Sequence, residues 1–154
     1  MTSAPKESTI PVIGSGKSLR IAVLSNPGSG KNRKGFNTIK TLLAKHPQVT
    51  HREACNPTEI AQALDEIAKT EPDILAINAG DGTHAATLTA LIHNKPFTKQ
   101  PLFALLRGGT TNMNAGDIGL RGKHNDALEK LITWANNTHL GVKIVRRPTL
   151  RINR

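Results

Sequence analysis

Several residue types are scarce in this sequence, and each scarcity excludes something. Among 154 residues there is one cysteine, Cys55, so no internal disulfide can form, which fits a reducing cytoplasm. We expect Cys55 to pack as a small apolar residue at a strand end. The four aromatic side chains offer no stacking platform for nucleic-acid bases. No apolar run approaches the roughly 20 residues of a membrane-spanning helix. The scarcities favour a cytoplasmic protein that binds no nucleic acid.

Acidic residues are also few, and their distribution is uneven. The net charge is +10, from 21 Lys and Arg against 11 Asp and Glu. Residues 1–36 carry six bases and one acid (+5), residues 37–79 four and six (−2), and residues 80–154 eleven and four (+7). Such a chain should attract anions, for example nucleotide phosphates or an anionic membrane. The basic stretch 143–154 fits either membrane contact or a solvated strand edge.

Short apolar runs alternate with helical patterns along the chain. Strands are predicted at 20–25, 49–54, 73–78, 102–106 and 142–145, and helices near 36–46, 57–68, 83–94 and 125–136, with a short polar helix or turn at 114–119. Continuous rather than alternating apolar strands indicate a parallel sheet buried on both faces. The prediction is an α/β fold in three layers, with a mostly parallel sheet covered by helices on both faces. Residues 1–18 are predicted to be a flexible leader, and 19–148 one α/β domain.

Three of the predicted strands end in glycine-bearing loops, at 26–30, 79–82 and 107–112. In a parallel sheet these strand-to-helix loops emerge at one edge, which is where ligands bind. Glycine lets backbone N–H groups approach phosphate oxygens, and the helix that follows adds unpaired amides and a positive dipole end. The edge is therefore predicted to bind phosphates.

The second loop is the most informative, because Gly80 and Gly82 flank a lone carboxylate, Asp81. In one interpretation Asp81 holds Mg²⁺, the glycines open the backbone, and Thr83 caps the helix or touches a phosphate. In the other, Asp81 only satisfies backbone amides in an Asx-type turn.

The other two loops are polar and lack a diagnostic nucleotide motif of their own. Arg107 could neutralise a phosphate, and Thr110 and Asn112 could bond a ribose, phosphate or acceptor hydroxyl. A helix-capping loop is the alternative there. The first loop is not a Walker A sequence, since Ser25 and Asn32 stand where that motif needs glycine and Ser or Thr.

The stretch Ala79-Gly80-Asp81-Gly82-Thr83 resembles the signature of the diacylglycerol kinase catalytic-domain family, and 25–30 and 109–115 resemble its first and third loops in the expected order. The resemblance covers roughly 19–152 and implies the N-terminal domain of the NAD kinase and diacylglycerol kinase fold. It implies an ATP site with Asp81 as catalytic residue and Mg²⁺ ligand. The nucleotide-binding residues would be Asn26, Gly28, Gly80, Gly82, Thr83, Arg107, Gly109, Thr110 and Asn112.

The activity implied by this resemblance is transfer of the ATP γ-phosphoryl group to the hydroxyl of a lipid such as diacylglycerol, by a cytoplasmic enzyme that can sit peripherally at the inner membrane face. In the family a second, β-rich domain supplies the catalytic base, and it would begin at 149–154. Ala79, residues 84–86 and Met113 depart from the family pattern, mainly on the acceptor side. An NAD kinase relative and a non-catalytic module that binds nucleotide or anionic lipid remain alternatives, and a homo-oligomer stays open.

Overall fold

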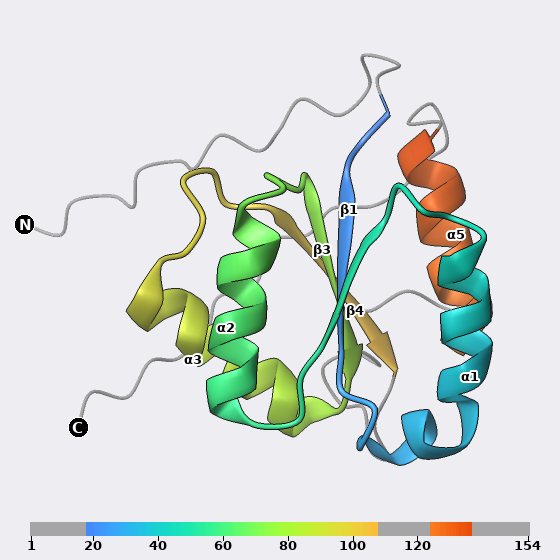
Figure 1. The fold of residues 1–154 in the computed structure, drawn as a ribbon, viewed down its shortest axis with the longest axis horizontal. Coiled ribbons are helices and arrows are strands. Elements are labelled where there is room, and N and C mark those ends of the chain that lie inside the picture. The colour runs from blue at the N-terminus through green and yellow to red at the C-terminus, as the bar shows by residue number, and fades with distance from the viewer. Residues whose placement is uncertain (1–17, 108–123, 137–154) are drawn as a thin grey trace, which may run out of the picture.

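A computed structural model describes residues 18–107 and 124–136 (Figure 1). The elements in chain order are β1 (Ile21–Ser25), α1 (Gly30–Ala44), β2 (Thr50–Glu53), α2 (Pro57–Ala68), β3 (Ile74–Ala79), α3 (Asp81–Asn94), β4 (Leu102–Arg107) and α5 (His124–Asn136). The strand predicted at 142–145, the turn at 114–119 and the domain limits at 1–18 and 149–154 lie outside these described residues.

The strands form one parallel sheet in the order β2-β1-β3-β4. Every residue of β1 and β3 is buried, which explains why their sequences are unbroken apolar runs. β2 lies at the edge of the described sheet and is half exposed, so its sequence pattern is weak. Because all four strands are parallel, their carboxyl ends lie at the same edge. The predicted α/β fold with a parallel sheet is confirmed.

Helices cover both faces of the sheet, α1 and α5 on one and α2 and α3 on the other (Figure 1). Successive strand residues point to opposite faces, so each strand feeds two separate apolar cores. The core under α1 and α5 includes Ile21, Val23, Ile39, Ile74, Leu128 and Trp134. The core under α2 and α3 includes Ala22, Leu24, Ile60, Leu64, Ile77 and Leu91. This is the predicted three-layer arrangement.

The helix starts show where the sequence pattern was sufficient and where it was not. α2 begins at Pro57 as predicted: the Glu59 N–H donates to Asn56 Oδ1 at 2.9 Å, and the Cys55 N–H donates to Glu59 Oε2 at 2.7 Å. α1 begins at Gly30 rather than near 36, because its first turns are polar and carry no apolar periodicity.

Two smaller predictions differ from the structure. α3 begins at Asp81 rather than Thr83, which places the carboxylate in the first helical turn. Cys55 is exposed, so the expectation that it packs was wrong. The chain turns there into the N-cap of α2, and the preceding Ala54 takes the buried position instead.

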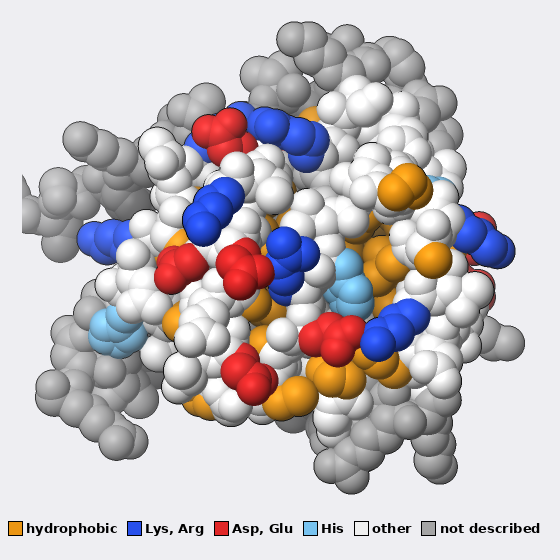
Figure 2. Space-filling view, viewed as in Figure 1, with side chains coloured by type: hydrophobic (Ala, Val, Ile, Leu, Met, Phe, Trp, Pro, Cys, Tyr) orange, Lys and Arg blue, Asp and Glu red, His pale blue; other side chains and the backbone are white. Residues whose placement is uncertain are grey.

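The described helices are at most 15 residues long, and the charged side chains on the face shown in Figure 2 are mixed. Within the described ranges, no helix is both long enough and apolar enough to span a membrane. On the face that carries α2, acidic and basic side chains are intermingled rather than separated into a patch of one sign (Figure 2).

Candidate functional site

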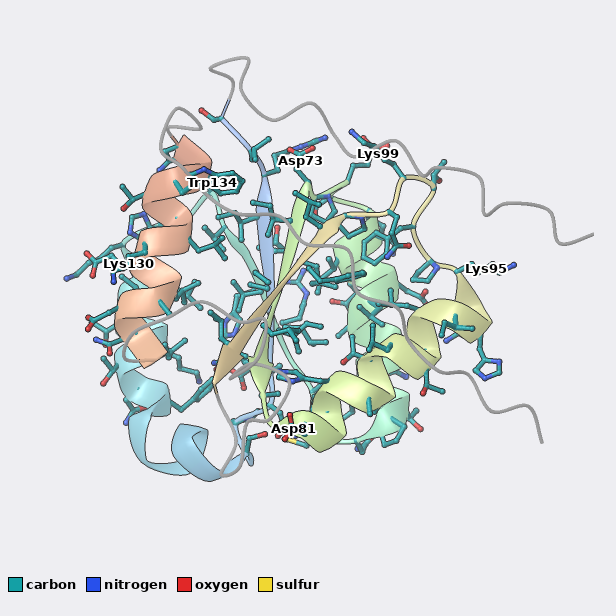
Figure 3. All side chains as sticks on the ribbon, turned by 180° about the vertical axis from the view of Figure 1, so that it is seen from behind. Asp73, Asp81, Lys95, Lys99, Lys130 and Trp134 are labelled. Atoms are coloured by element: carbon teal, nitrogen blue, oxygen red, sulfur yellow. The ribbon has the colours of Figure 1, made fainter. Side chains whose placement is uncertain are left out.

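The first two glycine loops meet at the edge formed by the carboxyl ends of the strands. Asn26 follows β1, Gly80 follows β3, and Asp81 opens α3. Asp81 lies at this edge, whereas Asp73 and Trp134 lie at the opposite one (Figure 3). Six predicted site residues come from these two loops: Asn26, Gly28, Gly80, Asp81, Gly82 and Thr83.

Asn26 fastens the first loop to the second. Its side-chain Nδ2 donates to Thr83 Oγ1 at 2.9 Å, across 57 positions of sequence. Its Oδ1 accepts a hydrogen bond from the Gly28 N–H at 2.9 Å, and its own backbone N–H donates to the Asn78 carbonyl at 3.0 Å. We call this set of contacts the Asn26 clamp. Asn26 and Thr83, which the sequence analysis only assigned to the same site, are joined by a hydrogen bond.

The structure excludes one of the two roles expected for Thr83, which was to cap the helix. The N-cap of α3 is Gly80, which has no side chain to cap with, and Thr83 lies in the first turn of the helix. Its hydroxyl oxygen accepts from Asn26. The expectation that Thr83 caps the helix was therefore wrong.

The space in front of the α3 N-terminus is open on the side of Gly82. A Cβ atom added at Gly82 would meet no heavy atom within 4 Å. The first N–H groups of a helix have no acceptor within the helix, and they attract anions. The Asp81 side chain beside them is 30% exposed. The position is accessible, polar and not filled by the described part of the chain.

A buried polar group lies directly behind the two loops. Ser25 and Asn78 are fully buried; Asn78 Nδ2 donates to Ser25 Oγ at 3.1 Å, and His51 Nε2 shares a hydrogen bond with Ser25 Oγ at 2.9 Å. Ser25 ends β1, Asn78 is the next-to-last residue of β3 and His51 lies in β2, so these residues join three neighbouring strands close to the Asn26 clamp. The sequence analysis missed them. Their only signal was a polar residue at the end of each apolar strand.

Burial lowers the pKa of His51 below its ordinary value of 6.5, Lys40 and Arg52 lower it further, and Glu53 opposes them. As the pH falls through about 6.5, the unfolded chain takes up a proton that folded His51 resists, so stability falls with pH. Above about pH 7 His51 is neutral in both the folded and the unfolded protein, so it no longer makes stability depend on pH. We expect a lower urea midpoint at about pH 5.5 than at about pH 7.5, and a shallower change in His51→Gln. An identical change in the two proteins would exclude His51 as a source.

The third loop is only partly placed. Arg107 ends β4, and its backbone pairs with Ala79 of β3, so this loop starts beside the second one. Gly109, Thr110 and Asn112 lie outside the described residues. Their place in the site stays a prediction.

The donor set determines which metal could fit. In the described part of the chain, no group of three or more His, Cys, Asp or Glu side chains could hold an ion. A cation at Asp81 would have one protein carboxylate, with water and phosphate oxygens as its other ligands. Mg²⁺ is bound in this way in nucleotide sites, so the residues present fit Mg²⁺ together with a phosphate chain.

Comparison with known proteins bears on the family and the fold. The family model described as diacylglycerol kinase catalytic domain matches residues 20–142. A diacylglycerol kinase structure from Bacillus anthracis str. Sterne has 21% sequence identity and a TM-score of 0.59, over 76% of this chain and 43% of that one. A second structure from the same organism has 22% identity and a TM-score of 0.58, over 76% and 42%. The chain thus spans less than half of these structures. No curated protein matches it.

Proposed function

Because the chain belongs to the diacylglycerol kinase catalytic domain family, we propose that it is the nucleotide-binding part of an ATP-dependent lipid kinase. The reaction would transfer the γ-phosphoryl group of ATP to a lipid hydroxyl, with diacylglycerol as the representative acceptor. In this reaction the hydroxyl oxygen forms a bond to the γ-phosphorus, the bond from that phosphorus to the β,γ-bridging oxygen breaks, and ADP leaves. The proton of the hydroxyl passes to a base.

One observation carries this proposal: the Asn26 clamp holds two glycine loops together while the space in front of α3 at Gly82 stays open. A side chain at position 82 would project into this opening, so glycine there leaves the space free for a ligand. Backbone amides at a helix N-terminus are suited to phosphate oxygens. Asp81, at the rim of the opening, supplies an anionic group.

The proposed roles follow from these positions. Mg²⁺, when bound, would neutralise charge on the phosphate chain, and the Asp81 carboxylate would hold it. Asn26, Gly28, Gly80, Gly82 and Thr83 would shape the nucleotide site. Arg107, Gly109, Thr110 and Asn112 would complete it from the third loop. Positioning and charge neutralisation supply most of the catalysis in phosphoryl transfer, so a rigid loop pair is the main contribution of these residues.

The proposal also covers the rest of the nucleotide-binding domain, a second domain and the basic stretch 143–154. Residues 19–148 would form the nucleotide-binding domain, and a second domain such as the longer relatives have room for would supply the base and the lipid contacts. The basic stretch 143–154 would help the protein to sit at an anionic membrane surface.

Calorimetric titration of the chain with ATP, with and without Mg²⁺, tests the nucleotide site. We expect saturable binding that tightens when Mg²⁺ is present. A folded sample that binds neither form would contradict the proposal.

Transfer of labelled phosphate tests the acceptor. Diacylglycerol in mixed micelles and NAD in solution are offered in parallel, with Mg²⁺-ATP as donor. Labelling of the lipid supports a lipid kinase, and labelling of NAD supports the NAD kinase alternative. Nucleotide binding without transfer to either acceptor, by a protein that also contains the second domain, would favour a non-catalytic binding module.

Gly82→Ala separates a ligand-binding role from a structural one. The added methyl group meets open space, so stability should rise by up to about 1 kcal/mol, while affinity for ATP falls about tenfold because the methyl occupies ligand space. Gly35→Ala in α1 is the matched control, since a Cβ there also meets nothing within 4 Å. It should raise stability without changing ATP affinity. Equal affinities in the two variants would remove Gly82 from the site.

A further inference from the structure

His84 occupies a buried position of α3 that faces the core, where an apolar side chain is usual. His84, Thr87 and Leu91 are the buried residues of this helix, and their spacing forms the inner stripe that faces the sheet. The His84 residue is 1% exposed. Neither of its ring nitrogens has a hydrogen-bond partner, although both are shielded from solvent. Burying polar groups without partners costs free energy, so the histidine needs a reason other than packing.

Two polar groups lie close to the ring, the Ile77 backbone and the carboxylate at the rim of the site, and neither is within hydrogen-bond distance. His84 Nδ1 lies 4.0 Å from Asp81 Oδ1, three residues earlier in the same helix. This distance is too long for a hydrogen bond, but a rotation of the Asp81 side chain could bring the pair to about 2.9 Å. The histidine thus approaches Asp81 from the protein interior, opposite the open space at Gly82.

An imidazole ring can donate a hydrogen bond at this position in its neutral as well as in its charged form. Burial lowers the pKa of the ring, and the nearby Ile77 backbone and the Asp81 carboxylate offset part of that effect. A neutral imidazole carries one N–H group and one acceptor nitrogen. It can donate a hydrogen bond to a carboxylate without neutralising the charge that Mg²⁺ would need.

We propose that His84 is a positioning residue for Asp81: its Nδ1–H donates to one carboxylate oxygen when Mg²⁺-ATP binds and so turns the other oxygen toward the ligand. The inference rests on the proposed function. The free protein carries the cost of an unpaired buried nitrogen, and ligand binding relieves it, so the new hydrogen bond adds to affinity. Partners that orient a metal-binding side chain in this way affect metal affinity by about 10- to 100-fold.

Leucine and asparagine at position 84 form a matched pair for the test, since the two side chains have nearly the same shape. The Asn amide nitrogen stands close to where Nδ1 of histidine lies, whereas Leu offers no donor. We expect His84→Leu to weaken Mg²⁺-ATP binding about tenfold in calorimetry and to leave binding of ATP without Mg²⁺ within twofold. His84→Asn should retain Mg²⁺-ATP affinity within about threefold.

Stability measurements separate positioning from packing. Because Leu removes two unsatisfied buried nitrogens, the urea midpoint of His84→Leu should equal or exceed that of wild type. A purely structural histidine would instead give a lower midpoint with an unchanged dependence of ATP affinity on Mg²⁺. That result would overturn the inference.

Nitrogen-15 spectra of the histidine side chains provide a readout on the wild-type protein that needs no variant. In the Mg²⁺-ATP complex we expect the His84 proton on Nδ1, and a proton on Nε2 alone would overturn the inference. If wild type shows no Mg²⁺-dependent binding, the proposed function fails and this inference fails with it. If wild type binds and His84→Leu matches it within twofold, only the role of His84 is overturned.

Discussion

Asp81→Asn is expected to reduce the affinity for Mg²⁺-ATP by about 100-fold, equivalent to about 2.7 kcal/mol, and to abolish Mg²⁺-dependent phosphoryl transfer by the full-length enzyme with its second domain. The substitution keeps the size of the side chain but removes the one carboxylate that we place at the α3 N-terminus. An amide oxygen is a much weaker ligand for Mg²⁺ than a carboxylate oxygen. Calorimetry with and without Mg²⁺ measures the effect, and ATP alone should bind about equally to both proteins.

Asp126→Asn is the matched control for this prediction. Asp126 lies in the first turn of α5, so its replacement makes the same change of charge at the same kind of helical position. We expect its Mg²⁺-ATP affinity to stay within about twofold of wild type. A similar loss in both variants would indicate a general effect of charge. Near wild-type transfer by Asp81→Asn would remove Asp81 from the mechanism.

The parts of the fold that depend on local pattern could be predicted. β1 and β3 are central strands buried on both faces, and burial on both faces requires the continuous apolar runs seen in the sequence. The start of α2 could be predicted because its signals are local: Asn56 accepts from the Glu59 N–H, Pro57 has no N–H to satisfy, and Glu59 accepts from the Cys55 N–H. The start of α1 could not, since nothing apolar marks its first two turns.

The sequence predicted which loops form the candidate site, but it did not predict the hydrogen bonds between their residues. A parallel sheet brings the first and second loops to one edge, so Asn26 and Asp81 could be assigned to the same site. No spacing rule, however, pairs Asn26 with Thr83 across 57 positions, and the sequence analysis, which expected Thr83 to cap the helix or touch a phosphate, did not predict this hydrogen bond. The hydrogen bonds between Ser25, His51 and Asn78 likewise depend on the strand order, which brings β2 and β3 to either side of β1.

His84 is a further residue that the sequence pattern could not single out. Six histidines are present, and no pair has the spacing of a metal site, so none was selected from the sequence. What distinguishes His84 is its burial without a hydrogen-bond partner beside Asp81, which exists only in the folded chain. A departure from local rules at a buried position marks a functional residue better than residue type does.

The second large effect is expected at the Asn26 clamp. Asn26→Ala removes the hydrogen bonds to Thr83 Oγ1 and from the Gly28 N–H, so unfolding free energy should fall by about 2 kcal/mol. Thr83→Val should cost about 1 kcal/mol. Since both substitutions break the same bond, the double variant should lose about 1 kcal/mol less than the sum. ATP affinity should fall about tenfold in Asn26→Ala, because the two loops are no longer held in one geometry.

Equilibrium unfolding in urea measures the stability of the single and double variants, and calorimetry measures the affinity of the same proteins for ATP. Thr83→Ser keeps the hydroxyl group, so it should retain the coupling with Asn26 and bind ATP nearly as wild type does. Strict additivity of Asn26→Ala and Thr83→Val would mean that the bond between them contributes nothing. Coupling in stability without any loss of ATP affinity would mean that the clamp holds the fold together but does not shape the nucleotide site. Loss of both shows that one hydrogen bond between distant loops serves stability and binding together.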